Sequence, residues 1–521
     1  MAAEDATKEQ QESDLMVPDG VKVFIEGLYN SLLIEDEAEM TKAYEVEYPK
    51  LTSMYYSQCP WPSAESIAPL VEDDPTFLAL YRDLGIRHMF AKLQPNLPTL
   101  QQKFDAWGNY CFLFDGILGD NKEIDLRKLP NSWTFDLLHE FVYQFQAFAQ
   151  FRCKWQSRTD EEKAALRANA DSWSTAKVLR YLSRFVKDSK ITQILKAQKD
   201  GAPAVEPPSP LMKMMGYFSV VMQSRQHCLL GDYHSCLKVL DPIMGAEGDG
   251  TSETKPTGIY VRVPICYVTL FYHAGFAQLM ARRYVDAIGT FQSALLFIFR
   301  NRLVSRGDQL QKWSDKLLAL LAIVTSLSPG HRLEEQVASK LREKYSEKTR
   351  RMQLGEETAF EDTFSYACPK FVLAAAPAMG EGDLSLNYSL DAHEVQLSVF
   401  MREVRQQLPL PTVVSYLRLY QTIGLDKLAR FRDADAAAVR SQLLSLKHKT
   451  LQPETPRDTA SLVDGERKSC SDVHFFVADE MAHVDGKEDD QQLGKFFIHH
   501  TQKLQEVVMD VGAIAKAAAA E

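Results

Sequence analysis

The sequence lacks the motifs by which nucleotide-binding proteins and the common hydrolases are recognised. It has no GxxxxGK[ST] loop, because the glycines of GAEGDGTSETKPTG come without the lysine or the preceding strand that such a loop needs. The pair His-Glu occurs at His139–Glu140 and His393–Glu394, but neither continues to the second histidine of an HExxH zinc site, and GxSxG is missing. We expect no catalytic residue, no cofactor and no small-molecule substrate. A cysteine–histidine nucleophile pair stays open.

Cysteine pairs are missing as well. The eight cysteines are scattered and no two form a CxxC pair, a pattern that favours reduced thiols in a cytosolic protein over a disulfide framework or a zinc cluster. His499 and His500 are adjacent, so on a helix they would point about 100° apart and could not share one metal as an i, i+4 pair does. We therefore expect no metal site.

Neither an excess of positive charge nor a membrane-length apolar run is present. The formal net charge is −11, so any contact with nucleic acid must come from a local patch. The longest apolar run, VPICYVTLFYHAGFAQLM, contains Pro264, His273 and Gln278 and predicts a buried helix. The first twenty residues have no basic, apolar leader and predict an acidic disordered tail. We expect a cytoplasmic protein without membrane contact.

What the sequence does have is a stretch rich in aromatic rings, FDLLHEFVYQFQAFAQFRCKW at Phe135–Trp155. A base-stacking platform, a β-strand and a buried helix face are the alternatives. Helical spacing favours the helix, with a buried face of Leu138, Phe141, Val142, Phe145, Phe148 and Ala149. The other side takes His139, Glu140, Gln144, Gln146 and Gln150, and Asn131 or Ser132 would cap the helix. A stacking platform needs a basic groove, and only two cations are near, so we interpret the rings as core.

Two later stretches share one helix–turn–helix pattern. Aligning Tyr233 with Tyr284, a period of 51 residues, places Cys236 on Ala287, Leu237 on Ile288 and Leu240 on Phe291. A tyrosine followed by a small and then by bulky residues is typical of tetratricopeptide-like hairpins. Two unrelated amphipathic hairpins are the alternative interpretation.

The region after these hairpins changes its period. TVVSYLRLYQTI, GLDKLARF and ADAAAVRSQLLSLKHKT predict three short helices, with Asp433 as the cap before the third. VHFFVADEMAHVDG alternates Val473, Phe475 and Val477 on one side, turns at Ala478-Asp479-Glu480 and continues as a second strand. Three helices followed by a β-hairpin are the pattern of a winged helix.

Breaks in composition, chiefly DGAPAVEPPSP and LAAAPAMGEGDLSLNYS, divide the chain. The predicted fold is all-α, with a tetratricopeptide-like helical-repeat solenoid leading into a C-terminal winged helix with a small β-hairpin and a long terminal helix. The predicted parts are an acidic tail (1–20), an N-terminal helical region (21–200), a Pro-rich linker (201–210), a helical-repeat part (211–371), a low-order connector (372–390), a winged-helix part (391–490) and a C-terminal helix (491–521).

Helical repeats that lead into a winged helix resemble the PCI domains of the proteasome lid, the signalosome and eukaryotic translation initiation factor 3. The local matches are more specific and resemble the subunit L family of that factor. They run in order from Cys59 to Phe371 and are CPWPSAESIAPLV, NYCFLFDGIL, LPNSW, EFVYQFQAFAQFRCK, MMGYFSVV, HCLLGDYHSCLKVL, LREKYSEKTRRMQ and FSYACPKF. GKFFIHHTQKL resembles the final helix of the family. The short acidic leader departs from the family, which leaves the role of the family's N-terminal extension in doubt here.

The resemblance implies a non-catalytic scaffold subunit of translation initiation factor 3, in a complex that supports initiation on the small ribosomal subunit. It implies assembly through the PCI domain with other subunits of the factor, subunits K and E among them. The alternatives are a PCI scaffold subunit of another complex, of the proteasome lid or signalosome type, and a winged-helix RNA-binding protein.

A weak RNA contact is possible at the end of the third winged-helix segment, where Arg440, Lys447 and Lys449 form a small basic cluster. The segment 405–490 has 12 Lys+Arg and 14 Asp+Glu, a net charge of 12 − 14 = −2, and phosphate binding needs several clustered cations. Lys447 and Lys449 at the end of a helix, facing solvent and stabilised by the helix dipole, are the alternative.

The C-terminal stretch contains a heptad seam, which predicts a partner-binding helix. Its residues, with steps of 4 and 3, are Leu493, Phe497, His500, Leu504, Val507, Val511 and Ile514. Such a helix could fold back on its own winged helix. The family resemblance implies instead that it joins a bundle with the C-terminal helices of other PCI subunits.

Overall fold

The computed structural model describes residues 17–92, 98–120, 124, 126–200, 203, 206–246, 263–301, 308–329, 331–373, 391–455, 461–469, 471, 473–484, 497–498, 500–505, 507–509 and 511. The chain divides into two compact units. The helical unit comprises Met1–Met401 and Glu454–Gly465, and the winged-helix unit comprises Arg402–Pro453 and Glu466–Glu521. The chain therefore passes from one unit to the other three times, after Met401, Pro453 and Gly465.

The helical unit opens with a series of helices, of which α3 and α7 begin at capping side chains. Their bounds are α2 (Asp19–Ile34), α3 (Glu37–Lys42), the π-helical turn η1 (Ala43–Glu47), α4 (Tyr48–Tyr55), α5 (Ala64–Ile67), the 3-10 turn η2 (Ala68–Leu70), α6 (Pro75–Lys92) and α7 (Leu100–Ile117). Asp36 caps α3 by accepting from two backbone amides, and Thr99 with Gln102 forms a capping box at α7. Helix α2 begins at Asp19, inside the segment predicted as the acidic tail.

The ring-rich stretch forms the long helix α8 (Asn131–Cys153), and its rings are core, as predicted. All six residues of the predicted buried face, from Leu138 to Ala149, are at most 2% exposed. On the other side, Gln144 and Gln146 are buried as well, and their amides bond Tyr110 and Arg225. One detail of the prediction was wrong. The helix has no side-chain cap, since its N-cap residue is Pro130 and Asn131 already lies inside it.

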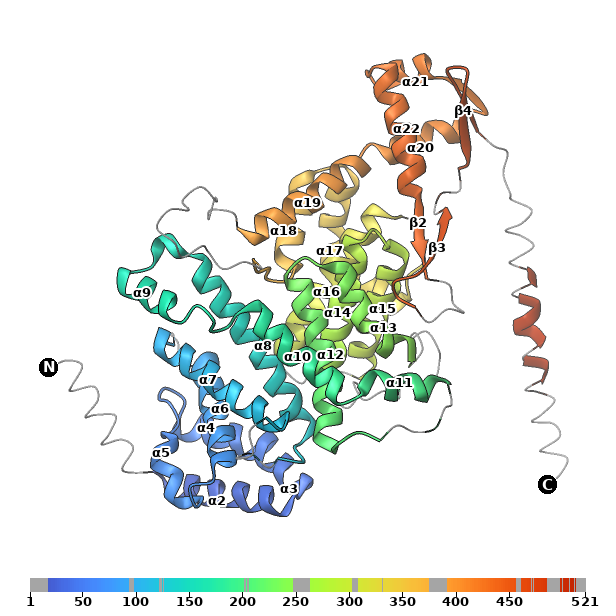
Figure 1. The fold of residues 1–521 in the computed structure, drawn as a ribbon. Coiled ribbons are helices and arrows are strands. Elements are labelled where there is room, and N and C mark those ends of the chain that lie inside the picture. The colour runs from blue at the N-terminus through green and yellow to red at the C-terminus, as the bar shows by residue number, and fades with distance from the viewer. Residues whose placement is uncertain are drawn as a thin grey trace. The chain divides into compact units, whose positions relative to one another are not determined.

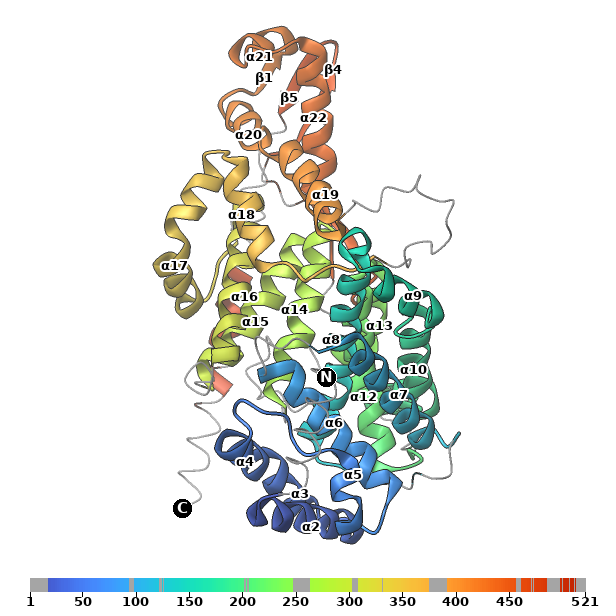
Figure 2. The same cartoon turned by 90° about the vertical axis from the view of Figure 1, so that its left-hand side faces the viewer.

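Along the chain, α8 is followed by η3 (Trp155–Ser157), α9 (Asp160–Ala168), α10 (Thr175–Asp188) and α11 (Ile191–Asp200), and then by two helical hairpins. The hairpins pair α12 (Pro210–Leu229) with α13 (Tyr233–Ala246) and α14 (Pro264–Met280) with α15 (Tyr284–Arg300). In Figures 1 and 2 these four helices and α16 (Asp308–Leu327) lie side by side as a stack. The residues aligned between the two stretches are at most 5% exposed, except Tyr233, which is partly exposed. The tetratricopeptide-like pattern thus predicted the packed face of both second helices.

The second hairpin is packed closely at a glycine. A Cβ added to Gly275 on α14 would lie 2.4 Å from Cε1 of Phe291 on α15, whose ring is completely buried. Real Cβ atoms do not approach carbon this closely, so glycine permits the contact between the two helices. The aligned position of Phe291 therefore fixes how near α14 and α15 can come.

The helical unit ends with α17 (Glu335–Gln353), α18 (Glu357–Ala367) and most of α19 (Ala392–Gln407). Helix α16 packs against α15, α17 and α18. Its segment from Leu317 to Val324 is apolar on every side and buried, as expected of a helix covered by neighbours all around.

The winged-helix unit contains the three predicted helices as α20 (Leu410–Leu419), α21 (Leu425–Phe431) and α22 (Ala436–Thr450). The predicted hairpin forms β4 (Phe475–Ala478) and β5 (Met481–Val484), joined by Asp479 and Glu480, both with positive φ. A separate core holds these elements together, and it includes Val413, Leu428, Leu443 and Ala482.

Three features of the winged-helix unit were not predicted. The short strand β1 (Thr422–Gly424) adds to the hairpin in the order β1-β5-β4, with Ile423 opposite Ala482. A second, two-stranded sheet pairs β2 (Leu451–Glu454) with β3 (Glu466–Ser469). The cap of α22 was wrong, because its N-cap residue is Asp435 without a side-chain bond, while Asp433 has φ +47° in the preceding turn.

The predicted fold class is confirmed. Both units are built mainly of helices, helical repeats precede the winged helix, and the β-structure consists of short strands in the C-terminal part of the chain.

Candidate interaction surfaces

The predicted basic cluster of the winged helix lies on α22, and each of its three cations has a partner inside the same unit. Arg440 Nη1 lies 3.5 Å from Glu480 Oε1. Lys447 Nζ donates to the carbonyl of Phe475 at 3.2 Å, and Lys449 forms an ion pair with Glu403. All three charges therefore take part in contacts within the unit.

Burial separates the members of this cluster. The side chain of Lys449 is only 9% exposed, so it does not face solvent as the alternative interpretation expected. Arg440 is 55% exposed, and an exposed pair such as Arg440–Glu480 contributes little to stability. A phosphate would have to compete with Glu403 for Lys449. The RNA contact stays a prediction.

The predicted seam of the C-terminal helix is described in part. Phe497, His500, Leu504, Val507 and Val511 are all helical, whereas Leu493 and Ile514 lie outside the described residues. Within the single chain, the exposed fractions of the side chains are 64% for Leu504, 56% for Val507 and 59% for Val511. Apolar side chains repeated along one side of a helix favour burial against another helix.

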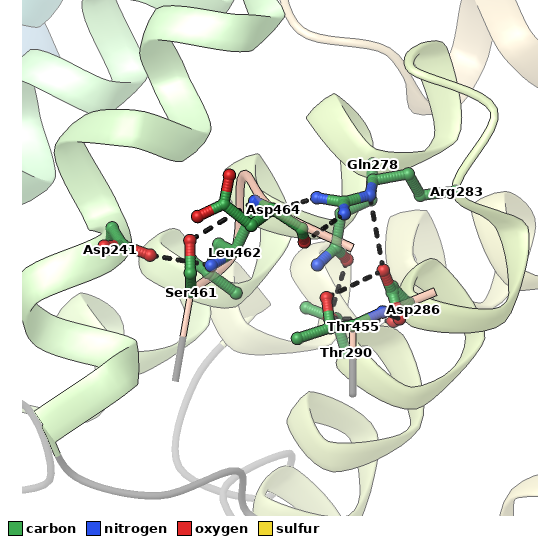
Figure 3. Close-up of polar contacts among 9 residues, drawn as sticks. All are labelled: Asp241, Gln278, Arg283, Asp286, Thr290, Thr455, Ser461, Leu462 and Asp464. Carbon is green, nitrogen blue, oxygen red and sulfur yellow. Dashed lines mark hydrogen bonds and ion pairs between the residues drawn. The ribbon is translucent and has the colours of Figure 1, made fainter. Parts of the chain in front are cut away.

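A third surface was missed by sequence analysis. Residues 454–465, which we call the arm, connect β2 to β3 and belong to the helical unit. Figure 3 shows Thr455, Ser461, Leu462 and Asp464 of the arm beside residues of α13, α14 and α15, with Arg283 pointing toward Leu462 and Asp464. The guanidinium of Arg283 donates to the carbonyls of Leu462 and of Asp464, the latter at 2.6 Å. Because its side chain is only 4% exposed, these bonds satisfy a cation that has lost most of its water.

Two carboxylates of the helical unit also bind the arm. Asp286 on α15 accepts from the amide of Thr455 at 3.2 Å and from its hydroxyl at 3.1 Å. Asp241 on α13 accepts from the amide of Leu462 at 2.6 Å. Asp286 also lies 3.5 Å from Nε of Arg283, so the cation and the carboxylates form one network with the arm (Figure 3).

The electrostatics of the network depend on the arm. Burial raises the pKa of Asp286, while the Thr455 amide and the charge of Arg283 oppose that shift. The arm ends at Gly465, where an added Cβ would lie 2.5 Å from Nη2 of Arg283 and 3.1 Å from the carbonyl oxygen of Glu454. No periodic pattern marks these residues, and Arg283 and Leu462 are 179 residues apart in the chain.

The structure also bears on the cysteine–histidine pair that the sequence left open. Sγ of Cys368 lies 3.6 Å from Nδ1 of His393, and Oγ of Ser365 lies 3.2 Å from Nε2 of the same ring. Burial raises the pKa of the Cys368 thiol to about 11, against the opposing charge of Lys316. An activated nucleophile needs a lowered thiol pKa, whereas the raised pKa of Cys368 favours the protonated thiol.

In the described part of the chain, no three His, Cys, Asp or Glu side chains come together as ligands for a metal ion. Within the same residues, no helix combines the length and the apolar character that crossing a bilayer requires.

The chain is similar to known proteins over most of its length. A family model described as RNA polymerase I-associated factor PAF67 matches residues 102–504. A Nematostella vectensis protein named eukaryotic translation initiation factor 3 subunit L is 40% identical over 508 residues, which cover 96% of this chain and 94% of the relative. The chain belongs to the eukaryotic translation initiation factor 3 subunit L family. Relatives with the same name from Gallus gallus and Homo sapiens are each 39% identical over 477 residues, 89% of this chain and 81% of each relative.

The family assignment confirms the resemblance found in the sequence. The match to the Nematostella relative extends over both units, because 96% of the chain is covered. The family model ends at residue 504, so its last matched position is Leu504 of the predicted seam.

Proposed function

We propose that the chain is a non-catalytic scaffold subunit of eukaryotic translation initiation factor 3 in the cytoplasm. Its proposed partners are other subunits of that factor, subunits K and E among them, and through the complex the small ribosomal subunit. The observation that carries the proposal is the 40% identity over 96% of the chain to a relative named subunit L. A helical-repeat unit followed by a winged helix fits a scaffold, because stacked repeats offer long surfaces to partners.

The proposed assembly element is the C-terminal helix. Its seam consists of Leu493, Phe497, His500, Leu504, Val507, Val511 and Ile514. Leu504, Val507 and Val511 are more than half exposed in the single chain, and burying such side chains against a partner helix would contribute on the order of 1.5–3 kcal/mol each. A bundle of C-terminal helices provides that burial.

We propose only a weak contact of Arg440, Lys447 and Lys449 with RNA. Lys449 is paired with Glu403 and largely buried, and Lys447 donates to a backbone carbonyl. Counterion release at several open phosphate contacts, the main source of sequence-independent affinity, is therefore limited at this site.

Co-purification of tagged chains from cell extract at mild salt tests the assembly element. A chain that ends before Gln491 and the full chain with Leu504→Asp should both lose the other subunits of the factor. The truncation removes the seam, and the carboxylate of the variant would have to be desolvated inside it. Gln505→Asp is the matched control, because it introduces the same charge about 100° around the helix from Leu504. It should retain the partners.

Circular dichroism of the purified chains completes the test. Both seam variants should stay soluble and keep a cooperative melt. If both keep all partners, assembly runs through the helical repeats or the winged helix. If both unfold, the helix packs on its own domain and the bundle proposal fails.

A further inference from the structure

A groove in the helical unit has no role in the assembly proposed above. It has a volume of about 1110 Å³ and lies between the start of α7, the second half of α8, η3 and the segments 370–373 and 391–392. Part of its lining is apolar, with Leu100, Ala147 and Val372, and part is charged. Its volume is at the upper end for a small-molecule pocket and suits an extended segment of chain.

The groove has an excess of positive charge, whereas the whole chain is negatively charged. Its lining contains four cations, Lys103, Lys154, Arg158 and Lys370, and two carboxylates, Glu162 and Asp391, whereas the chain has a net charge of −11. Arg158 lies 3.8 Å from Glu162, and Asp391 accepts from the amide of His393 at 3.1 Å.

The three lysines of the groove differ from Arg158. In the part of the chain that the structure describes, Lys103, Lys154 and Lys370 form no ion pair with a carboxylate. Burial and the charge of Arg158 lower the pKa of Lys103, and the charge of Glu162 opposes that shift. An anion in the groove would relieve this repulsion.

The aromatic rings beside these cations already contact cations of the chain itself. Nζ of Lys103 lies 3.9 Å from the ring centroid of Phe151, and Cζ of Arg158 lies 4.0 Å from it. Arg167 lies over the ring of Trp155 at 5.6 Å. Stacking platforms for nucleic acid need open ring faces, and cations of the chain itself compete for these. Carboxylates need only the cations and no open ring face, so they fit the groove better than nucleic-acid bases do.

We propose that this groove binds an acidic linear segment of a partner protein. Its carboxylates would pair with Lys103, Lys154 and Lys370, and its apolar side chains would contact Leu100, Ala147 and Val372. The groove would then be a second interface, independent of the C-terminal helix, so a chain truncated before Gln491 retains it.

Fluorescence anisotropy with the full chain tests the proposal. The probe is a fluorescein-labelled peptide of about twelve residues made of Glu-Glu-Leu repeats, long enough to follow a groove when extended. The double variant Lys154→Glu with Lys370→Glu should weaken binding at least about tenfold. Both lysines are exposed, so the fold should be kept, and an unchanged melting curve checks this.

A matched control separates the groove from the net charge. Lys50→Glu with Lys238→Glu changes the net charge by the same amount, and both lysines are exposed and outside the groove. This control should bind the peptide within about twofold of the unchanged chain. Equal weakening in both double variants, or no binding of the peptide to the unchanged chain, would overturn the proposal.

A second probe addresses the alternative occupant. A labelled oligouridylate of about twelve nucleotides should bind more weakly than the peptide, with no selective loss in the groove variant. If the oligouridylate is the tighter ligand and only the groove variant loses it, the groove is a nucleic-acid site and the peptide proposal is wrong.

Discussion

Glu140 shows how strongly the interior of the helical unit acts on a single group. This carboxyl lies on α8 directly before the buried Phe141. Burial raises its pKa from 4.5 to about 7, and the nearby carboxyls of Asp83 and Asp136 act in the same direction. Arg87 and Arg225 oppose the shift but do not cancel it. The folded chain thus favours the neutral form of Glu140.

The pH dependence of stability follows from this shift. An acid whose folded pKa is raised costs nothing below its unfolded pKa of 4.5, and its cost grows as the pH rises to about 7. The full cost is about 3 kcal/mol. We predict that Glu140→Gln is more stable than the unchanged chain at pH 8 and similar to it at pH 5. Urea denaturation followed by tryptophan fluorescence measures this, because all six tryptophans lie in the helical unit.

The control for Glu140 is Glu26→Gln, an exposed position on α2. It should leave the difference in stability between pH 5 and pH 8 unchanged. Equal pH profiles for Glu140→Gln and the unchanged chain would show that the carboxyl of Glu140 is hydrated.

Single residues also show where sequence analysis stops. The burial of Phe141 and Phe145 could be predicted, because helical periodicity puts them on one face. The burial of Gln144 and Gln146 could not. Their amides are buried because Tyr110 and Arg225, on other helices, supply their bonds, and a pattern within α8 contains no information about those partners.

At the scale of elements, the distance between α14 and α15 is set at Gly275. Alanine there would gain about 1 kcal/mol of helix propensity. It would also place Cβ 2.4 Å from Cε1 of Phe291, and overpacking a core costs typically 1–3 kcal/mol. Since Phe291 is fully buried, its ring cannot swing out. We predict that Gly275→Ala lowers the free energy of unfolding of the helical unit, measured by urea denaturation.

The next helix supplies the control. Gly289 on α15 has open space at its Cβ position, so Gly289→Ala should raise the free energy of unfolding by up to about 1 kcal/mol. Opposite signs for the two variants are the expected result. A stabilising Gly275→Ala would mean that the hairpin adapts and that Phe291 does not fix the spacing.

The elements of the winged helix show the same limit of prediction. The alternation of apolar and polar residues predicted β4 and β5, because each strand has four residues, which is long enough for the alternation to be recognised. Strand β1 has only three residues, Thr422–Gly424, and is a strand because Ile423 pairs with Ala482. Its existence depends on a partner far along the chain, so the local sequence does not encode it.

At the scale of the whole molecule, the chain connects its two units at three points instead of one. One connection runs through α19, and the other two leave the ends of the arm. The ends of the arm are held by Arg283, Asp286 and Asp241. The polar network holds the arm in the helical unit, and the chain continues from each end of the arm into the winged-helix unit. The domain order could be predicted from sequence, but this connectivity could not, because its contacts join residues up to 221 positions apart.

Removing Arg283 should release the arm. In Arg283→Ala the carbonyls of Leu462 and Asp464 lose their donor, and Asp286 loses its cation, which leaves a buried carboxylate with weaker compensation. We predict that the amide of Leu462 exchanges with solvent at least about tenfold faster, as its bond to Asp241 opens more often. Hydrogen exchange read by mass spectrometry measures this.

Lys238→Ala, at an exposed position on α13, should leave the exchange unchanged. Faster exchange confined to the arm, with α15 unaffected, is the result that local release requires. Faster exchange throughout α15 would show that Arg283 supports the repeat itself, and unchanged exchange at Leu462 would show that Asp241 alone holds the arm.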